Sequence, residues 1–597
     1  MDIEKKLEEI IQKYSMEIDI NNLLKEEIKI YLESQIGYDE KIGIMCAGRH
    51  TEHLLKDFND LLHPYCLLDS DPQKVGTTIE GIVISDIKKC KDVDKIIIST
   101  TDYREEVKER LENLGFPREK MIDIYDYLNQ NGLLSPYTYY SMQDNIYVPF
   151  IFLNNRYKSS GKESDYLYML IKSYLNIRDI KTSLDCMEEY IEKGFEEKEC
   201  IKELYNEVCS FMTEIKDTLA KRNKRDIIWF WQDALCFDWV EFMPFYQEER
   251  KKGLFFTNTY NSSVWTRCVY ELIFNKRYEI DDDAWRDSEN IRCDWIKQLE
   301  QRGYQCVRVS NESDNEVELM RDFDFRKNKV SSFNQATSQL YWTLINYIVN
   351  SKSPVCILAH SVIETHAPIC SPDLEKYSAS WSAFNMRFRA DMKEKMMKNV
   401  RSTCKYLDGI TEYTSELFGD VAVKIYMSDH GSALTLKSRR WNKDANHFNF
   451  IVVGGKIEPK ECKGLFSLYQ FDKVIEYILN PSYGNLNNIF QKEIVLQSVD
   501  VYNKNTIEAF IKLGFEEYCI SFRGMQGEMD RYILLKTGKE IYNVFPDDYT
   551  NHINRVEYQD RINEYRKKVG TVFVGDDEEK FQYTHILYDF LKAGKQN

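Results

Sequence analysis

Two short segments of this chain are apolar enough to form buried strands, and each is followed closely by an aspartate. Residues 227–231 precede Asp233, and the alternating Val423, Ile425 and Met427 precede the sequence 429–431, which is Asp-His-Gly. Open α/β sheets bind ligands at the carboxyl ends of their strands, so we expect these polar residues at such an edge. Neighbouring strand side chains point apart, so Asp429 and His430 meet one ion only if the backbone turns, which Gly431 permits.

Asp233 and Thr266 each allow two interpretations. A carboxylate just beyond a strand serves as a metal ligand or as the N-cap of a following helix. Thr266 follows a loop rich in Asn, Ser and Thr and lies at the predicted start of a helix. Free N–H groups and the helix dipole favour an anion there. The alternative is that Thr266, Ser262 or Ser263 is an ordinary helix cap.

The order of these features resembles the alkaline phosphatase superfamily, particularly its sulfatase-like hydrolases and its phosphoethanolamine and phosphoglycerol transferases. In that family an Asp after the first strand, a Thr, Ser or modified Cys at a helix start, and an Asp-His-Gly element share one metal ion. The resemblance implies that Asp233, Thr266, Asp429 and His430 hold one divalent ion, zinc or manganese. It also implies that Thr266 is the nucleophile.

The resemblance extends through `ILAHSVIETHAPI` (357–369), `NHFNFIVVGGKI` (446–457) and a terminal hairpin within 530–553. It implies that His366 and His447, with Glu364 as a further candidate, contact substrate or hold a weaker second ion. We interpret His360 and Asp408 as structural residues.

The residues near Thr266 narrow the implied reaction. Cys268 lies in `WTRCV`, which lacks the Pro and Arg that follow the nucleophile of sulfatases, so a formylglycine and sulfate ester cleavage are disfavoured. A Thr nucleophile is similar to the phosphatases, phosphodiesterases and phosphotransferases of the superfamily. The resemblance therefore implies a phosphoester hydrolase or phosphotransferase with a covalent phospho-enzyme, acting on a soluble sugar, glycan or alcohol phosphate ester. The alternatives are a binding module with a degenerate metal site and a sulfate ester hydrolase.

The amino-terminal part of the chain predicts a different unit. Strands alternate with helices over residues 38–130, which predicts a parallel, three-layer α/β domain. It resembles Rossmann-like domains attached to sugar-modifying bacterial enzymes, through `DSDP` (69–72) and a later element at 76–81. Gly43 and Gly48 do not make the dinucleotide fingerprint. A domain that binds no small molecule and a nucleotide-dependent enzyme are therefore both alternatives.

The whole chain is predicted to belong to the α/β class. We expect an N-terminal helix over 1–37, the Rossmann-like domain over 38–130 and a helical linker region over 131–225. The resemblance implies a sulfatase-like catalytic domain over 226–597, built as an α/β/α sandwich with a small C-terminal β subdomain.

Composition limits the partners and the compartment. The 597 residues carry a net charge of −17 without a separate basic cluster, which excludes a nucleic acid partner. No segment reaches the roughly 18 to 20 apolar residues that span a bilayer, and the acidic amino-terminal helix has no signal-peptide pattern. The 15 cysteines are scattered, as expected for small core residues in a reducing compartment. The sequence therefore predicts a cytoplasmic protein without an integral membrane segment, and it sets no oligomeric state.

Overall fold

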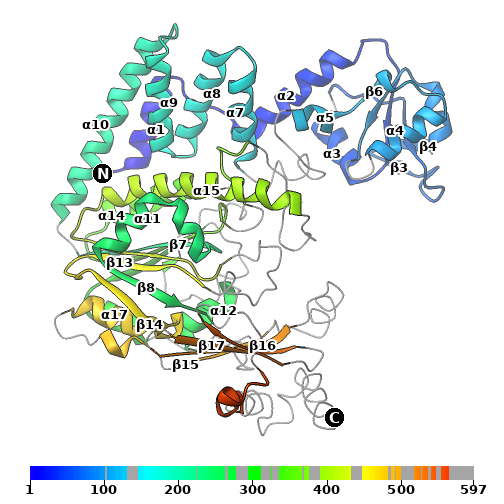
Figure 1. Cartoon of the computed structure of the whole chain (residues 1–597). Helices are drawn as coiled ribbons and strands as arrows, with labels where there is room; N and C mark the ends of the chain where they lie inside the picture. Colours follow the sequence, from blue (N-terminus) through cyan, green and yellow to red (C-terminus); the bar gives the residue numbers. More distant parts are fainter. Residues whose placement is uncertain are drawn as a thin grey trace.

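The described part of the chain forms three sheets with helices around and between them (Figure 1). The computed structural model describes residues 1–58, 60–100, 104–130, 146–222, 225–261, 266–276, 294–310, 324–325, 335–365, 369–375, 390–431, 447–481, 486–490, 493–498, 517–525, 528–535, 540–545 and 553–563.

The first sheet is mainly parallel and carries helices on both faces. Its order is β3-β4-β2-β1-β5-β6. The strands are β1 (Ile42–Met45), β2 (Cys66–Asp69), β3 (Thr78–Ile79), β4 (Ile82–Asp86), β5 (Lys95–Ile98) and β6 (Met121–Ile122). Because side chains alternate along a strand, Ile44 joins a core with α3 (Arg49–Asp57) and α5 (Ile124–Gln130), whereas Met45 joins another with α4 (Arg104–Asn113). The predicted three-layer unit is therefore present.

Helices fill most of the next region. They are α7 (Val148–Ser159), α8 (Glu163–Asn176), α9 (Ile180–Glu192) and α10 (Lys198–Arg222), each packed against the next. The segment 1–37 forms two helices, α1 (Ile3–Lys13) and α2 (Ile20–Gln35), and not the single helix that we predicted. The chain turns between them, where Ser15 has φ +53°. All described helices are too short or too polar to cross a membrane.

An eight-stranded sheet forms the centre of the third region, in the order β10-β9-β11-β7-β12-β13-β8-β14. The strands are β7 (Ile227–Gln232), β8 (Leu254–Thr259), β9 (Gln305–Ser310), β10 (Asp324–Phe325), β11 (Val355–Ser361), β12 (Val423–Met427), β13 (Phe450–Gly454) and β14 (Lys460–Phe466). Strands β9, β11, β7 and β12 are parallel, and β13 is antiparallel to both of its neighbours.

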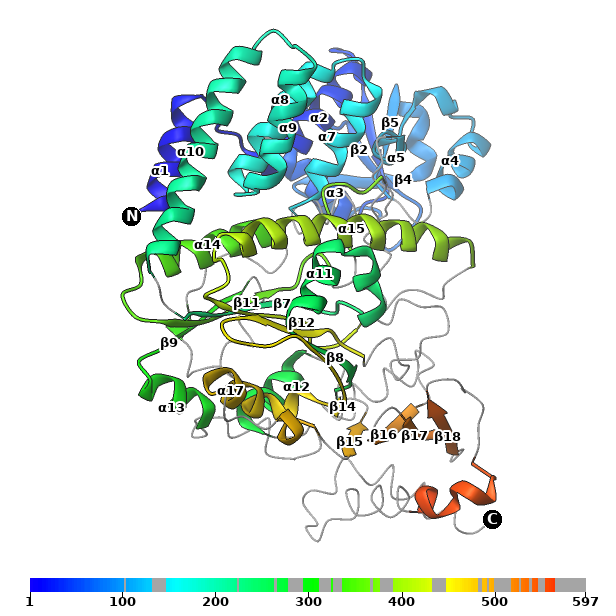
Figure 2. The same ribbon diagram turned by 60° about the vertical axis from the view of Figure 1, so that its left-hand side comes forward.

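Both faces of this sheet are covered. Phe230 of β7 faces a core shared with α14 (Thr337–Asn350) and α15 (Ala390–Glu416), and that core continues into α7–α10. Trp229 and Trp231 face the opposite core, shared with α13 (Asp294–Gln301) and α17 (Phe471–Leu479). The long helix α15 lies between the sheet and the helices α8–α10 (Figure 2). The expected α/β/α arrangement is confirmed.

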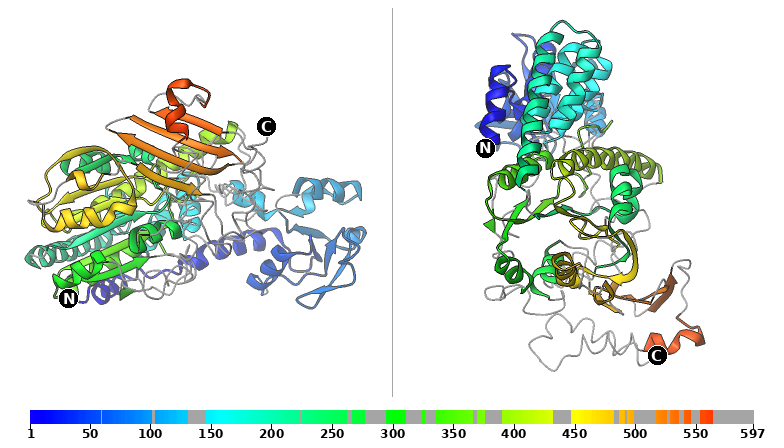
Figure 3. Two further views of the ribbon diagram at one scale, coloured as in Figure 1. Left: turned by 90° about the horizontal axis from the view of Figure 1, so that it is seen from below. Right: turned by 90° about the vertical axis from the view of Figure 1, so that its left-hand side faces the viewer.

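The expected C-terminal β subdomain is a four-stranded antiparallel sheet. It comprises β15 (Glu493–Ser498), β16 (Glu517–Met525), β17 (Glu528–Leu535) and β18 (Glu540–Phe545). Strands β17 and β18 form the hairpin expected within 530–553. This sheet lies at the end of the molecule away from α7–α10 (Figure 3).

Candidate functional site

Three neighbouring parallel strands bring polar residues to one edge of the large sheet. The register pairs Trp231 of β7 with His360 of β11 on one side and with Met427 of β12 on the other. Asp233 follows β7 and Asp429 follows β12, so both carboxylates leave the sheet at its carboxyl edge. Open α/β sheets bind ligands at this edge. The strands that we predicted before Asp233 and Asp429 are confirmed.

A sharp turn holds the two aspartates together. Ala234 has φ +56°, and its amide donates a 3.1 Å hydrogen bond to Asp429 Oδ1. The next described helix is the 3₁₀ helix η3 (Phe237–Phe242), whose N-cap is Cys236. The interpretation of Asp233 as a helix cap is therefore wrong, because the chain turns before that helix begins.

Both carboxylates are buried, with Asp233 only 2% exposed and Asp429 fully covered. Burial raises the pKa of Asp429, and the neighbouring carboxylate of Asp233 raises it further. Two buried acids side by side are costly unless a cation or hydrogen-bond donors balance their charge.

Thr266 directs its hydroxyl group into this pair. It is the first residue of α12 (Thr266–Tyr270), as the sequence predicted, and it is 9% exposed. Its Oγ1 donates a 2.9 Å hydrogen bond to Asp233 Oδ2 and lies 3.5 Å from His430 Nε2. The hydroxyl is therefore oriented by a carboxylate.

His430 presents a ring nitrogen to the same point. Its Nε2 lies 3.3 Å from Asp429 Oδ2 and 3.8 Å from Asp233 Oδ1. Its Nδ1 lies 2.7 Å from the carbonyl oxygen of Gly431, which can only accept, so Nδ1 carries the hydrogen. In the neutral ring, Nε2 then offers a lone pair. The chain leaves β12 at Met427, which allows the adjacent Asp429 and His430 to converge.

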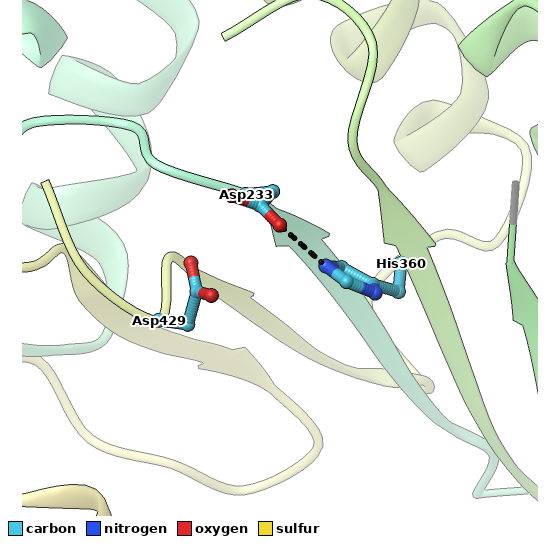
Figure 4. A group of neighbouring side chains, drawn as sticks. All are labelled: Asp233, His360 and Asp429. Atoms are coloured by element: carbon cyan, nitrogen blue, oxygen red, sulfur yellow. Dashed lines mark ion pairs between the residues drawn. The ribbon is translucent and has the colours of Figure 1, made fainter. Parts of the chain in front are cut away.

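His360 is a member of the cluster that the sequence did not reveal. Its Nε2 lies 3.4 Å from Asp233 Oδ2, and His360, Asp233 and Asp429 each offer an atom within 4.8 Å of the others (Figure 4). We predicted a structural histidine because the residue lies within a strand. The strand order, which sequence does not reveal, places β11 beside β7 and so brings His360 to Asp233.

Glu364 is engaged elsewhere. Its carboxylate accepts 2.5 Å hydrogen bonds from the hydroxyls of Tyr147 and Thr337 and a 2.9 Å hydrogen bond from Ser361. These contacts link the start of α7 to the region after β11. We therefore leave Glu364 out of the proposed ligand set.

The remaining candidates divide as follows. His447 is stacked between Phe237 and Tyr260, and its Nε2 lies 3.0 Å from the carbonyl oxygen of Thr257. His366 lies outside the described residues. Asp408 accepts hydrogen bonds from the first two amides available at the start of α11 (Pro244–Lys252), and the prediction that it is structural is confirmed.

The carboxylate oxygens and the imidazole nitrogen at the sheet edge suit a divalent cation. Asp429 Oδ2 is buried, and His430 Nε2, which has a lone pair in the neutral ring, lies 3.3 Å from it. Two electron-rich atoms in this position repel each other unless a positive charge lies between them. Carboxylate oxygen and imidazole nitrogen are ligands that zinc and manganese accept.

No family model and no curated protein matches this sequence. Solved structures are similar to it. A candidate sulfatase from Bacteroides thetaiotaomicron is 12% identical with a TM-score of 0.44, over 62% of this chain and 93% of that chain. A phosphonate monoester hydrolase of Agrobacterium radiobacter is 10% identical with a TM-score of 0.42, over 58% and 95%. An alkaline phosphatase superfamily protein from Vibrio parahaemolyticus is 12% identical with a TM-score of 0.39, over 64% and 96%.

Proposed function

We propose that this protein is a metal-dependent phosphoester hydrolase or phosphotransferase of the alkaline phosphatase superfamily, with Thr266 as its nucleophile. The observation that carries the proposal is the 2.9 Å hydrogen bond from Thr266 to Asp233 beside a second buried carboxylate and two imidazole rings. The proposed substrate is a soluble sugar, glycan or alcohol phosphate ester, and the proposed catalytic domain is 226–597.

Four side chains would hold the ion in this proposal: Asp233, Thr266, Asp429 and His430. Zinc or manganese bound there would lower the pKa of the attacking hydroxyl and withdraw charge from the transferring group. The backbone supports this set, because the Ala234 amide fixes Asp429 Oδ1 and the Gly431 carbonyl fixes the His430 ring. Such outer contacts orient ligands and tune their affinity.

The proposed reaction has two steps. Thr266 Oγ1 attacks phosphorus, a P–Oγ1 bond forms, and the bond to the leaving oxygen breaks with its electron pair. The hydroxyl proton leaves along the hydrogen bond toward Asp233 Oδ2. Water or an acceptor hydroxyl then attacks phosphorus, the P–Oγ1 bond breaks, and Thr266 regains a proton. Water gives a hydrolase and an alcohol gives a transferase.

The position of Thr266 supports phosphoester over sulfate ester chemistry. The side chain that contacts Asp233 is the hydroxyl of a threonine, which stands two residues before Cys268. The proposed nucleophile therefore needs no conversion of a cysteine to formylglycine.

Replacement of the nucleophile tests the proposal. We expect Thr266→Ala to lower kcat on p-nitrophenyl phosphate or bis-p-nitrophenyl phosphate by about 1,000-fold or more, and Thr266→Ser to keep activity within about 10-fold. The matched control is Thr218→Ala in α10, which removes a hydroxyl that donates to the carbonyl oxygen of Glu214 in the same helix.

Two results would contradict the proposal. Thr266→Ala activity within a few-fold of the parent would remove the nucleophile, and faster turnover of p-nitrophenyl sulfate would replace the substrate class. Elemental analysis of the purified full chain measures the bound metal directly.

A further inference from the structure

A buried chain of contacts leads from β9 to the candidate site. Arg308 of β9 donates a 2.8 Å hydrogen bond to the hydroxyl of Tyr270 in α12. That hydroxyl lies 2.6 Å from His360 Nδ1, and His360 Nε2 lies 3.4 Å from Asp233 Oδ2. Arg308, Tyr270 and His360 are each at most 1% exposed. Strands β9 and β11 and helix α12 thus each contribute one residue to a path that ends at Asp233, the carboxylate that also orients Thr266.

Arg308 and Asp233, at the two ends of this path, indicate where the hydrogens of Tyr270 and His360 lie. Arginine only donates, so the oxygen of Tyr270 accepts from Arg308. At the other end, a lone pair on His360 Nε2 would face a carboxylate oxygen and be repelled, whereas an N–H there is attracted. A neutral ring with its hydrogen on Nε2 has an acceptor at Nδ1, which suits the hydroxyl hydrogen of Tyr270.

The two histidines of the cluster therefore differ. His430 Nδ1 faces a carbonyl oxygen, which fixes its hydrogen there and leaves Nε2 as a lone pair. His360 Nδ1 faces a hydroxyl, which can donate to it. The partner of Nδ1 therefore determines which nitrogen carries the hydrogen in each ring, and the two neutral rings present different groups at Nε2.

We infer that His360 is a positioning residue that holds Asp233 by the attraction of an Nε2–H group for its carboxylate, and that Tyr270 and Arg308 keep the hydrogen of His360 on Nε2. This inference rests on the proposed function, because the ion bound by Asp233 is the one proposed there. His360 is then not a metal ligand, although it lies within ligand distance of Asp233 and Asp429. The path of contacts through Arg308, Tyr270 and His360 sets the metal affinity by holding the Asp233 carboxylate in place.

The same residues also pack, and the test must separate packing from hydrogen bonding. The Tyr270 ring lies 5.1 Å from the Trp231 ring, and the Arg308 guanidinium lies 5.0 Å from the Tyr270 ring. Tyr270→Phe keeps the ring and removes only the hydroxyl. Tyr426→Phe is the matched control, because Tyr426 is equally buried and its hydroxyl bonds to Ser415 on the opposite face of the sheet.

The experiment measures binding of Co²⁺ to the full chain after removal of metal with a chelator. We expect Tyr270→Phe to weaken Co²⁺ affinity by about 10-fold, the size of effect seen when a residue that orients a metal ligand is replaced. The melting temperature of the metal-free protein should change no more than it does in Tyr426→Phe. We expect His360→Gln, whose amide can still donate, to keep the visible absorption bands of bound Co²⁺. His430→Ala should change those bands, since it removes a ligand.

Three outcomes overturn the inference in different ways. Equal Co²⁺ affinity in Tyr270→Phe and the parent would show that this path of contacts does not affect metal binding. Altered Co²⁺ bands in His360→Gln would make His360 a ligand. If the parent protein binds neither Co²⁺ nor Zn²⁺, the proposed metal site is wrong and this inference is wrong with it. If the parent binds metal but the variants do not behave as expected, only the role of Arg308, Tyr270 and His360 is wrong.

Discussion

At the scale of single residues, the candidate site is organised at the expense of stability. Asp233 and Asp429 are both buried, and burial together with the charge of Asp233 raises the pKa of Asp429. An acid whose pKa is raised in the fold destabilises that fold whenever it is charged. A position that stores such repulsion and also faces a lone pair of His430 is typical of a binding site and not of a core.

This conflict predicts opposite effects for Asp429→Asn. Asparagine keeps an oxygen for the Ala234 amide and removes the negative charge. We expect the metal-free protein at pH 7 to gain about 1 kcal/mol in the free energy of unfolding, and the affinity for zinc to fall by more than about 100-fold. Urea unfolding and calorimetric titration measure the two quantities. Asp420→Asn, at an exposed position, is the control, and a loss of stability in Asp429→Asn would contradict the idea of stored repulsion.

At the scale of elements, the end of β7 is shaped by one strained residue. Ala234 adopts φ +56°, a region that side chains other than glycine rarely occupy. The turn gives Asp429 its backbone donor and separates Asp233 from the helix that follows. Strain of this kind at a ligand edge is retained when the surrounding structure requires the turn.

The turn can be tested by two substitutions at one position. Ala234→Gly should change the free energy of unfolding by less than about 1 kcal/mol, because relief of strain offsets the greater freedom of the unfolded chain. Ala234→Val should destabilise the fold by about 2 kcal/mol or more and weaken zinc binding, because a β-branched side chain opposes this φ. Denaturant unfolding and metal titration compare the pair. Equal stability of the two variants would refute the role of strain.

At the scale of the whole molecule, buried polar contacts join the helical region to the large sheet. Asp179 caps α9 through a 3.0 Å hydrogen bond from the Thr182 amide, and it also accepts a 2.7 Å hydrogen bond from Tyr406 of α15. Glu364 accepts a hydrogen bond from Tyr147 at the start of α7. These links place Asp179 and Glu364 at a junction between the two regions.

The junction predicts a specific dependence on pH. Burial raises the pKa of Asp179 from 3.8 to about 6, so the folded protein binds a proton more tightly than the unfolded chain. The cost of the charged group is therefore fully present above pH 6 and is lost as the pH falls from 6 toward 4. A pKa difference of about two corresponds to about 3 kcal/mol.

Asp179→Asn removes this titration and keeps a capping side chain. We expect the variant to gain stability relative to the parent at pH 7 and to lose that advantage at pH 4.5, measured as urea unfolding at each pH. Asp165→Asn in α8, at an exposed position, should show no such change. A difference between Asp179→Asn and the parent that is constant with pH would contradict the prediction.

The sequence alone determined the elements that carry the site and the polar residues at their ends. Apolar runs fixed β7 and β12, so Asp233, Asp429 and His430 could be assigned to strand ends, and Thr266 to a helix start, since these patterns depend on neighbours in the chain. The alternation of predicted strands and helices over 38–130 also predicted helices on both faces of the first sheet.

Only the tertiary structure decided which strands are neighbours and where each buried side chain is satisfied. It brought His360 to Asp233, placed Tyr270 and Arg308 behind it, and engaged Glu364 with Tyr147, none of which a local pattern encodes. The physical reason is that these contacts join residues far apart in the chain, and a buried polar group takes whichever partner the packing of distant elements supplies.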